Sequence, residues 1–92
     1  MVQNGMEQTE RNWERLRSVK DLHEADLMSK ANVVGVGIGL RQRAGQPTGE
    51  PAIVVSVTHK VPASLVHPDD VIPSELDGVP VDVQEIGRLR AL

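Results

Sequence analysis

Histidines and acids are the side chains of this sequence best suited to acid–base or metal chemistry. His59 and His67, with Asp69 and Asp70, form the one plausible local cluster. A zinc site needs three or four converging ligands, and the chain has no cysteine and no pair of histidines at helical i, i+4 spacing. We therefore expect no metal site and no cofactor. A small His/Asp-based metal-binding or hydrolytic domain stays open as an alternative.

The five serines offer no recognisable nucleophile. None lies in a Gly-x-Ser-x-Gly turn. Ser64 is three residues from His67, but a catalytic triad also needs a third group that orients the base. We expect no catalytic residue and no enzymatic activity.

Gly35, Gly37 and Gly39 alternate with aliphatic residues at a strict spacing of two. A dinucleotide-binding loop has a different glycine spacing and leads into a helix, whereas Leu40 and two arginines follow here. Glycines on one face of a strand let another backbone or a large side chain approach closely. We expect these three glycines to mark close backbone packing, against the N-terminal helix or a second subunit.

The charges are unevenly distributed along the chain. Between Val61 and Gly87 there are six acids and no Lys or Arg. This pattern is typical of a solvated acidic loop, or it provides an acidic docking face for a basic partner or for arginines of another copy. The candidate interaction residues are Asp69, Asp70, Glu75, Asp77, Arg41, Arg43, Arg88 and Arg90.

The first third of the chain has the composition of a helix. Residues 1–32 contain no proline and are rich in Glu, Arg, Gln, Lys and Leu. We expect a disordered tail over residues 1–6 and one helix over residues 7–31 that Asn32 ends in the left-handed conformation. An apolar stripe on this helix comprises Trp13, Leu16, Leu27 and Ala31, with Val19 at its margin.

The rest of the chain has the composition of strands and turns. It holds all six prolines and most of the valines. Period-two alternation predicts three strands, at residues 33–43, 52–60 and 79–86. The Gly- and Pro-rich residues 44–51 predict a long hairpin loop, and two short helical turns are expected at 63–65 and 73–76. Asp77-Gly78 is a strong turn signal.

Length and composition limit the class of protein. Ninety-two residues allow one small domain, and exclude a barrel enzyme or a doubly wound nucleotide-binding domain. Trp13 is the one aromatic residue, so the core must be aliphatic. The net charge of −3 disfavours nucleic acid, and no apolar run is long enough to span a bilayer. We expect a cytoplasmic protein with no membrane partner.

Several segments together resemble a known family. They are Asn32 to Gly39, Glu50 to Val57, Val71 to Val83 and Glu85 to Leu92, and the run Ile-Pro-x-Glu-Leu-Asp-Gly-Val-Pro-x-Asp-Val is the most specific. In order and spacing they resemble the N-terminal region that precedes the peptidase domain in a group of bacterial trypsin-like serine peptidases. That group carries its His, Asp and Ser in the following domain, and no triad motif occurs in these 92 residues. The resemblance implies an accessory module, whole or part of a longer peptidase.

The expected architecture is α+β, with an N-terminal helix on a three-stranded, mainly antiparallel sheet made of a hairpin and a returning third strand. The expected function is non-catalytic protein interaction, through docking to or regulation of a trypsin-like peptidase, or through self-assembly. Because so short a chain buries a thin core, we expect a homo-oligomer. A structural scaffold subunit, assembled through its helix, is the further alternative.

Overall fold

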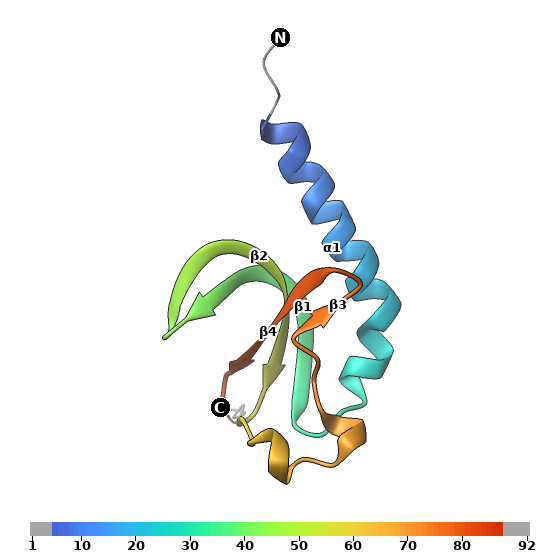
Figure 1. Ribbon diagram of the computed structural model, residues 1–92, viewed down its shortest axis with the longest axis vertical. Helices are drawn as coiled ribbons and strands as arrows, with labels where there is room; N and C mark the ends of the chain where they lie inside the picture. Colours follow the sequence, from blue (N-terminus) through green and yellow to red (C-terminus); the bar gives the residue numbers. More distant parts are fainter. Residues whose placement is uncertain (1–4, 88–92) are drawn as a thin grey trace, which may run out of the picture.

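One long helix lies against a four-stranded sheet in the computed structural model, which describes the backbone of residues 5–87 and the side chains of residues 11–87 except residue 63 (Figure 1). The helix α1 spans Gly5–Met28, and the strands are β1 (Val33–Arg43), β2 (Gln46–Val57), β3 (Glu75–Leu76) and β4 (Val79–Glu85). Two short 3-10 helices, η1 (Ala63–Leu65) and η2 (Pro68–Asp70), lie between β2 and β3. The α+β class is therefore confirmed, and the expected number of three strands is corrected to four.

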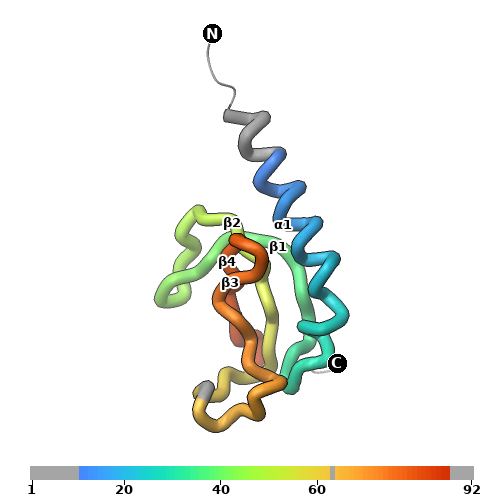
Figure 2. The backbone as a smooth tube through the Cα atoms, turned by 45° about the vertical axis from the view of Figure 1, so that its right-hand side comes forward, coloured from blue at the N-terminus to red at the C-terminus, as the bar shows by residue number. Residues whose placement is uncertain are grey.

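The strand order is β1-β2-β4-β3. β1 pairs with β2 and β3 with β4 in antiparallel fashion, whereas β2 and β4 are parallel neighbours. A parallel pair needs a crossover connection, and the chain from Thr58 to Gly78 supplies it. This connection passes along one end of the sheet before the chain returns into β4 (Figures 1 and 2).

The helix packs through the predicted apolar stripe. Leu16, Val19 and Leu27 are buried, and Trp13 packs against them at the edge of the core. The helix ends at Met28, earlier than the predicted residue 31, and two turn residues separate it from Ala31 and Asn32. Asn32 does adopt the predicted left-handed conformation, with φ 68°. Of the tail predicted over residues 1–6, residues 1–4 lie outside the described residues and the other two are helical.

Lys20 and His23 interrupt this stripe, and each has a polar partner. Lys20 Nζ lies 2.8 Å from Glu24 Oε1 and 3.2 Å from Asp21 Oδ1. These side-chain hydrogen bonds, that to Glu24 first, raise the pKa of the Lys20 ammonium above its usual value. His23 reaches across to the sheet, as described below. The helix therefore combines a narrow apolar stripe with flanking polar contacts.

The hairpin between β1 and β2 differs from the expected long loop. β1 has its predicted bounds, but β2 begins at Gln46, and the turn consists of Ala44 and Gly45, both with positive φ. Pro47 and Pro51 lie within β2, opposite Gln42 and Leu40. A strand tolerates proline where its N–H side is unpaired, and this part of β2 has no β4 residue beside it. Both prolines therefore lie in the part of β2 that pairs with β1 and not with β4.

A short hairpin replaces the helical turn expected at residues 73–76. Glu75 pairs with Pro80 and Leu76 with Val79, around the turn at Asp77 and Gly78. Both turn residues have positive φ, of 48° and 84°, as a two-residue hairpin turn requires. The turn prediction is confirmed, and the strand before it was missed because two residues show no alternation.

The core is aliphatic, as predicted. Ile53, Val55 and Val57 of β2 are buried on the sheet face toward α1, where they meet Leu27, and the described residues include no buried polar or charged side chain. The buried core residues are Leu16, Val19, Leu27, Val33, Ala52, Ile53, Val55, Val57, Val79 and Val81. Within the described residues, no helix is long and apolar enough to cross a membrane.

Candidate functional site

A cavity of about 470 Å³ lies between the end of α1, the end of β2 and the crossover connection. Its volume falls within the range that is typical of ligand pockets. Most of its wall is aliphatic, because the crossover connection contributes valine, leucine and isoleucine side chains to it. The aliphatic lining residues are Ala31, Val57, Val61, Leu65, Val66, Val71, Ile72 and Val83.

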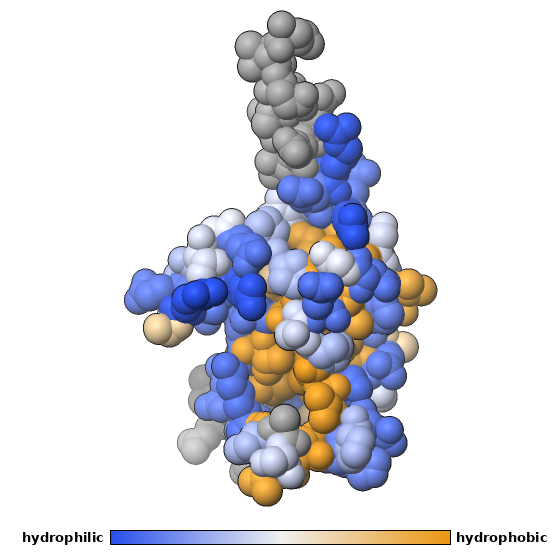
Figure 3. Space-filling model, viewed as in Figure 1, coloured by the Kyte–Doolittle hydropathy of each residue, from blue (hydrophilic) through white to orange (hydrophobic). Residues whose placement is uncertain are grey.

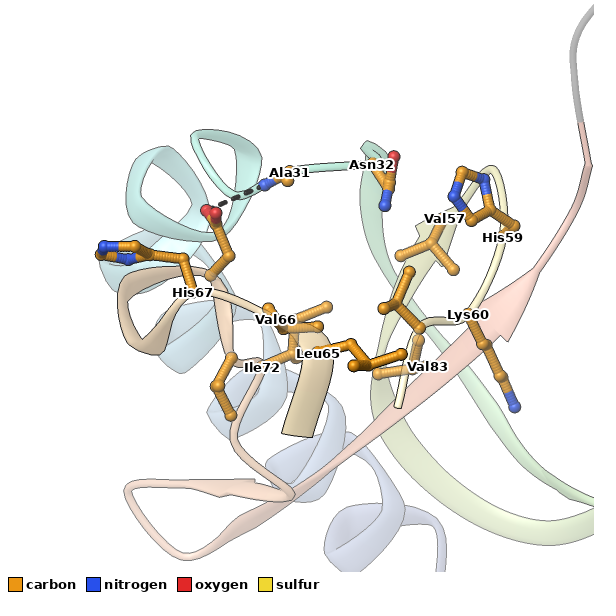
Figure 4. A pocket seen from close by; sticks show the side chains of 13 residues that line it. Ala31, Asn32, Val57, His59, Lys60, Leu65, Val66, His67, Ile72 and Val83 are labelled. Carbon is orange, nitrogen blue, oxygen red and sulfur yellow. Dashed lines mark hydrogen bonds between the residues drawn. The ribbon is translucent and has the colours of Figure 1, made fainter. Parts of the chain in front are cut away.

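Polar side chains stand at two ends of the cavity (Figure 4). Asn32 and His59 lie at one end, and the Lys60 side chain on the rim beside them points away from the cavity. His67 lies at the other end, and its ring turns away from the cavity. The main-chain hydrogen bond from Thr58 N to Asn32 O, 3.0 Å long, holds the first polar end together.

Exposed aliphatic residues surround the mouth of the cavity. Leu65 is 75% exposed and Val71 is 40% exposed, and both also line the cavity. Ile86 is 47% exposed and donates its backbone N–H to Val57 O at 2.9 Å, so the end of β4 lies beside the cavity wall. Apolar side chains also gather over the sheet and connection on the face drawn in Figure 3. A cavity with an apolar rim is suited to an apolar group of a partner.

The candidate acids Asp69 and Asp70 bind the connection to the end of α1. Asp70 Oδ1 accepts a hydrogen bond from Ala31 N at 3.0 Å, and Lys30 Nζ donates to the carbonyl oxygen of Asp69 at 2.7 Å. His67 Nδ1 accepts from Asp69 N at 3.1 Å and caps η2. These contacts form one wall of the cavity.

The other two candidate acids lie on the β3–β4 hairpin, beside an earlier part of α1. Asp77 Oδ2 is 2.9 Å from His23 Nε2, and the Asp77 carbonyl oxygen accepts from Arg15 Nη2 at 2.8 Å. Glu75 is exposed. The four acids therefore lie at two separate places beside the helix. They do not form the single acidic docking face that the sequence suggested.

The candidate arginines lie apart from both places. Arg41 pairs with Glu50 across the β1–β2 hairpin, with 3.0 Å between Nη1 and Oε1. Arg43 is exposed at the end of β1. Arg88 and Arg90 lie outside the described residues, so the structure tests neither of them.

The glycine row lies on the sheet face opposite α1. Gly35, Gly37 and Gly39 pair with Ser56, Val54 and Ala52, whereas their neighbours Val36 and Ile38 pair with the buried Val55 and Ile53. A Cβ at Gly37 would meet nothing within 4 Å, and at Gly35 and Gly39 it would meet side chains of β2 alone. The prediction that α1 packs closely on these glycines is thus wrong. That a second subunit covers them stays a prediction.

A shallow groove runs along this glycine face, and polar side chains of β4 cross it. Gln84 Nε2 donates to the Leu40 carbonyl oxygen at 3.4 Å and to Asp82 Oδ2 at 2.9 Å. The same Asp82 oxygen accepts from Gln42 N at 2.9 Å. These bonds reach from β4 over β2 to the irregular part of β1, where the register shifts. The strand order does not predict them.

The histidines do not converge on a common point. His59 and His67 stand on opposite sides of the cavity (Figure 4). Among the described residues there is no group of three or more His, Cys, Asp or Glu arranged to hold a metal ion. His59 Nδ1 is 3.2 Å from Thr58 Oγ1, and His67 caps η2. Both rings therefore have local polar partners.

The fold and cavity define a small α+β domain with an aliphatic, ligand-sized cavity beside the end of its last strand. The family model described as the NARROW LEAF 1 N-terminal domain matches residues 13–84, and the chain belongs to this family. The family is named for the N-terminal region of a plant trypsin-like peptidase-related protein, and this chain is thus an accessory region of the NARROW LEAF 1 type. A comparison with curated proteins gave no match.

The family match confirms the resemblance to the N-terminal region of trypsin-like peptidase relatives. It shows no bacterial context, so the bacterial affiliation stays a prediction. Sequence reasoning named His59, His67, Asp69 and Asp70 but not the cavity between them. The signal was present in the aliphatic residues of the connection, where Leu65, Val66, Val71 and Ile72 lie among prolines and acids.

Proposed function

We propose that this chain is a non-catalytic accessory module that docks onto the trypsin-like peptidase domain of a NARROW LEAF 1-type protein. The mouth of the aliphatic cavity is the docking surface. Two exposed aliphatic side chains, Leu65 and Val71, carry this proposal, because both line the concave site and present apolar area at its mouth. Such patches, rimmed by polar residues, are typical of interaction sites.

The direction of the chain favours the peptidase domain as the occupant. The domain is an N-terminal region in its family, so in a protein of that family the peptidase-related part lies on the C-terminal side of this domain. β4 ends at Glu85, whose carboxylate accepts a hydrogen bond from Lys60 N at 2.8 Å, beside the cavity. A peptidase domain joined after β4 in such a protein would start near the mouth, and a short tether would raise its effective concentration there.

Two leucines of equal exposure provide a matched test. Leu65 is 75% exposed at the cavity mouth, and Leu22 is 74% exposed on α1 and does not line the cavity. Isothermal titration calorimetry would measure binding of the 92-residue chain to a separately purified peptidase domain of a NARROW LEAF 1-type protein. We expect Leu65→Asp to weaken binding at least about tenfold, since burying a leucine is worth about 1.5–3 kcal/mol. Leu22→Asp should leave binding unchanged.

Other outcomes would contradict this docking surface. Equal effects of the two substitutions would place the contact elsewhere, and no binding by the unchanged chain would reject the peptidase domain as partner. A complex of this chain with itself alone, seen by analytical ultracentrifugation, would favour the predicted homo-oligomer instead. The cytoplasmic location and the absence of nucleic-acid and membrane partners stay predictions.

A further inference from the structure

The polar groups at the cavity mouth differ in whether the chain itself satisfies them. Each nearby acid accepts a hydrogen bond from the backbone: Asp70 from Ala31 N and Glu85 from Lys60 N. Lys60 has no carboxylate within 4.0 Å of its ammonium among the described side chains, and neither has the ring of His59. Among the described side chains the Lys60 ammonium is thus without an ion-pair partner, whereas Asp70 and Glu85 each accept a backbone hydrogen bond.

Lys60 and His59 lie beside the aliphatic wall of the cavity. Lys60 and His59 are exposed, and both belong to the set of residues that line the cavity. Val57 and Val83 lie directly beside them, and the Asn32 side chain faces the same end (Figure 4). An aliphatic group in the cavity would therefore have a neighbouring anion within reach of Lys60, whose four-carbon stem lets the ammonium turn toward it.

We propose that the cavity recognises an aliphatic side chain that is flanked by a carboxylate, presented on the surface of the peptidase domain. This inference rests on the proposed function and specifies the chemistry of its partner. The aliphatic side chain fills the space among Val57, Leu65 and Val83. The carboxylate pairs with Lys60 and accepts a hydrogen bond from the Asn32 amide. It also accepts one from His59 when the imidazole nitrogen that faces the carboxylate carries a proton.

Short peptides isolate this chemistry from the rest of the partner. The probe is acetyl-Ala-Glu-Leu-Ala-amide, and the comparison peptides replace its Glu by Gln or its Leu by Ala. Binding to the ¹⁵N-labelled 92-residue chain is followed by the amide chemical shifts of the residues around the cavity. For so small a ligand we expect dissociation constants on the order of millimolar. We expect a loss of about tenfold for Leu to Ala and about threefold for Glu to Gln.

A pair of cation variants assigns the charge preference to its residue. In the Lys60→Gln variant, the Glu and Gln peptides should bind with nearly equal dissociation constants. The peptide carboxylate has then lost its partner, so replacing Glu by Gln removes no further interaction. Arg43→Gln, which removes a cation at the end of β1, should leave the ratio of these two constants unchanged. His59→Gln should reduce the ratio less than Lys60→Gln does, since His59 is proposed as a hydrogen-bond donor and Lys60 as the ion-pair partner.

Three results would overturn the inference. They are equal binding of the Glu and Gln peptides, equal binding of the Leu and Ala peptides, and shifts confined to residues away from the cavity. These failures differ from failure of the proposed function. If the peptides show no preference while Leu65→Asp still abolishes binding of the peptidase domain, the docking surface stands and its carboxylate recognition is wrong. If the peptides behave as expected but the peptidase domain does not bind, the partner is wrong.

Discussion

The connection from β2 to β4 meets helix α1 in two regions, and the two regions differ in what lies beneath the contact. At the β3–β4 hairpin, Asp77 bonds to His23 and Arg15, and buried residues such as Val79 lie beside the turn. At the end of α1, Asp70 bonds to Ala31 N in a similar way, but a cavity of about 470 Å³ opens next to it. Polar contacts therefore hold the connection to the helix both where the core beneath is packed and where a cavity lies beside them.

The difference teaches where stability and function reside. In the hairpin region, aliphatic side chains and the polar bonds act together on the same packed core. In the cavity region, polar bonds hold the connection in place while its aliphatic side chains stay partly exposed. Truncating an apolar side chain should therefore cost much stability in the packed region and little at the cavity mouth.

The largest expected effect compares two leucines. Leu27 is 1% exposed on α1, and Leu65 is 75% exposed at the cavity mouth. Leu27→Ala should lower the free energy of unfolding by about 2–5 kcal/mol, and Leu65→Ala by less than about 1 kcal/mol. Urea titration followed by circular dichroism measures both. A Leu65→Ala variant as unstable as Leu27→Ala would mean that the mouth is part of the core.

A glycine pair tests the hairpin region next. Gly78 has φ 84°, and a Cβ there would lie 2.8 Å from Arg15 Nη2. Gly78→Ala should cost about 1–3 kcal/mol of unfolding free energy, mainly through the left-handed backbone. Gly37→Ala should be neutral or stabilise by up to about 1 kcal/mol, since a Cβ there meets nothing within 4 Å. Thermal and urea denaturation compare the two, and a neutral Gly78→Ala would refute the argument from backbone conformation.

An acid at the cavity wall gives a smaller effect. Asp70→Ala removes the acceptor of the Ala31 N–H and should cost about 0.5–1.5 kcal/mol of unfolding free energy. Asp70→Asn retains an acceptor oxygen and should keep most of that stability. Hydrogen exchange of the Ala31 amide provides the local measurement. Equal exchange rates in the two variants would show that this bond does not hold the connection.

The smallest effect is expected at the His23–Asp77 pair. Its side chains are 27% and 54% exposed, and exposed ion pairs contribute little. His23→Gln should change the free energy of unfolding by less than about 1 kcal/mol. Chemical denaturation at low and high salt measures this change. A loss of several kcal/mol would mean that the hairpin is held by this one contact instead of by its packed side chains.

Much of the fold follows from local patterns in the sequence. The alternation of Val34 to Leu40 predicts β1, the Asp77-Gly78 turn predicts the start of β4, and the stripe through Leu16 and Leu27 predicts the buried face of α1. Each signal depends on neighbours a few residues apart. The parallel pairing of β2 with β4 depends on residues far apart in the chain, so local patterns left open which strand edge β4 would join.

The candidate site was less accessible to the same reasoning. The distribution of charge along the sequence placed four acids in one group, Asp69, Asp70, Glu75 and Asp77. In the fold, Asp77 contacts Arg15 of α1 and Asp70 contacts Ala31 just after the helix, so the group is divided. The glycine spacing indicated a closely packed strand face, against the helix or a second subunit, without showing which face of the sheet it was. The cavity depends on how Ala31, Val57 and Leu65 come together from three segments, and no spacing in the sequence encodes that arrangement.

Amide chemical-shift mapping of the ¹⁵N-labelled chain, titrated with an unlabelled peptidase domain of a NARROW LEAF 1-type protein, tests the central claim most directly. The account predicts saturable shifts at His59 and Lys60, at Leu65 to His67 and at Asp70 to Ile72, which line the cavity. Saturable shifts confined to Gly35 to Gly39 or to the exposed side of α1, or no shifts at all, would contradict it.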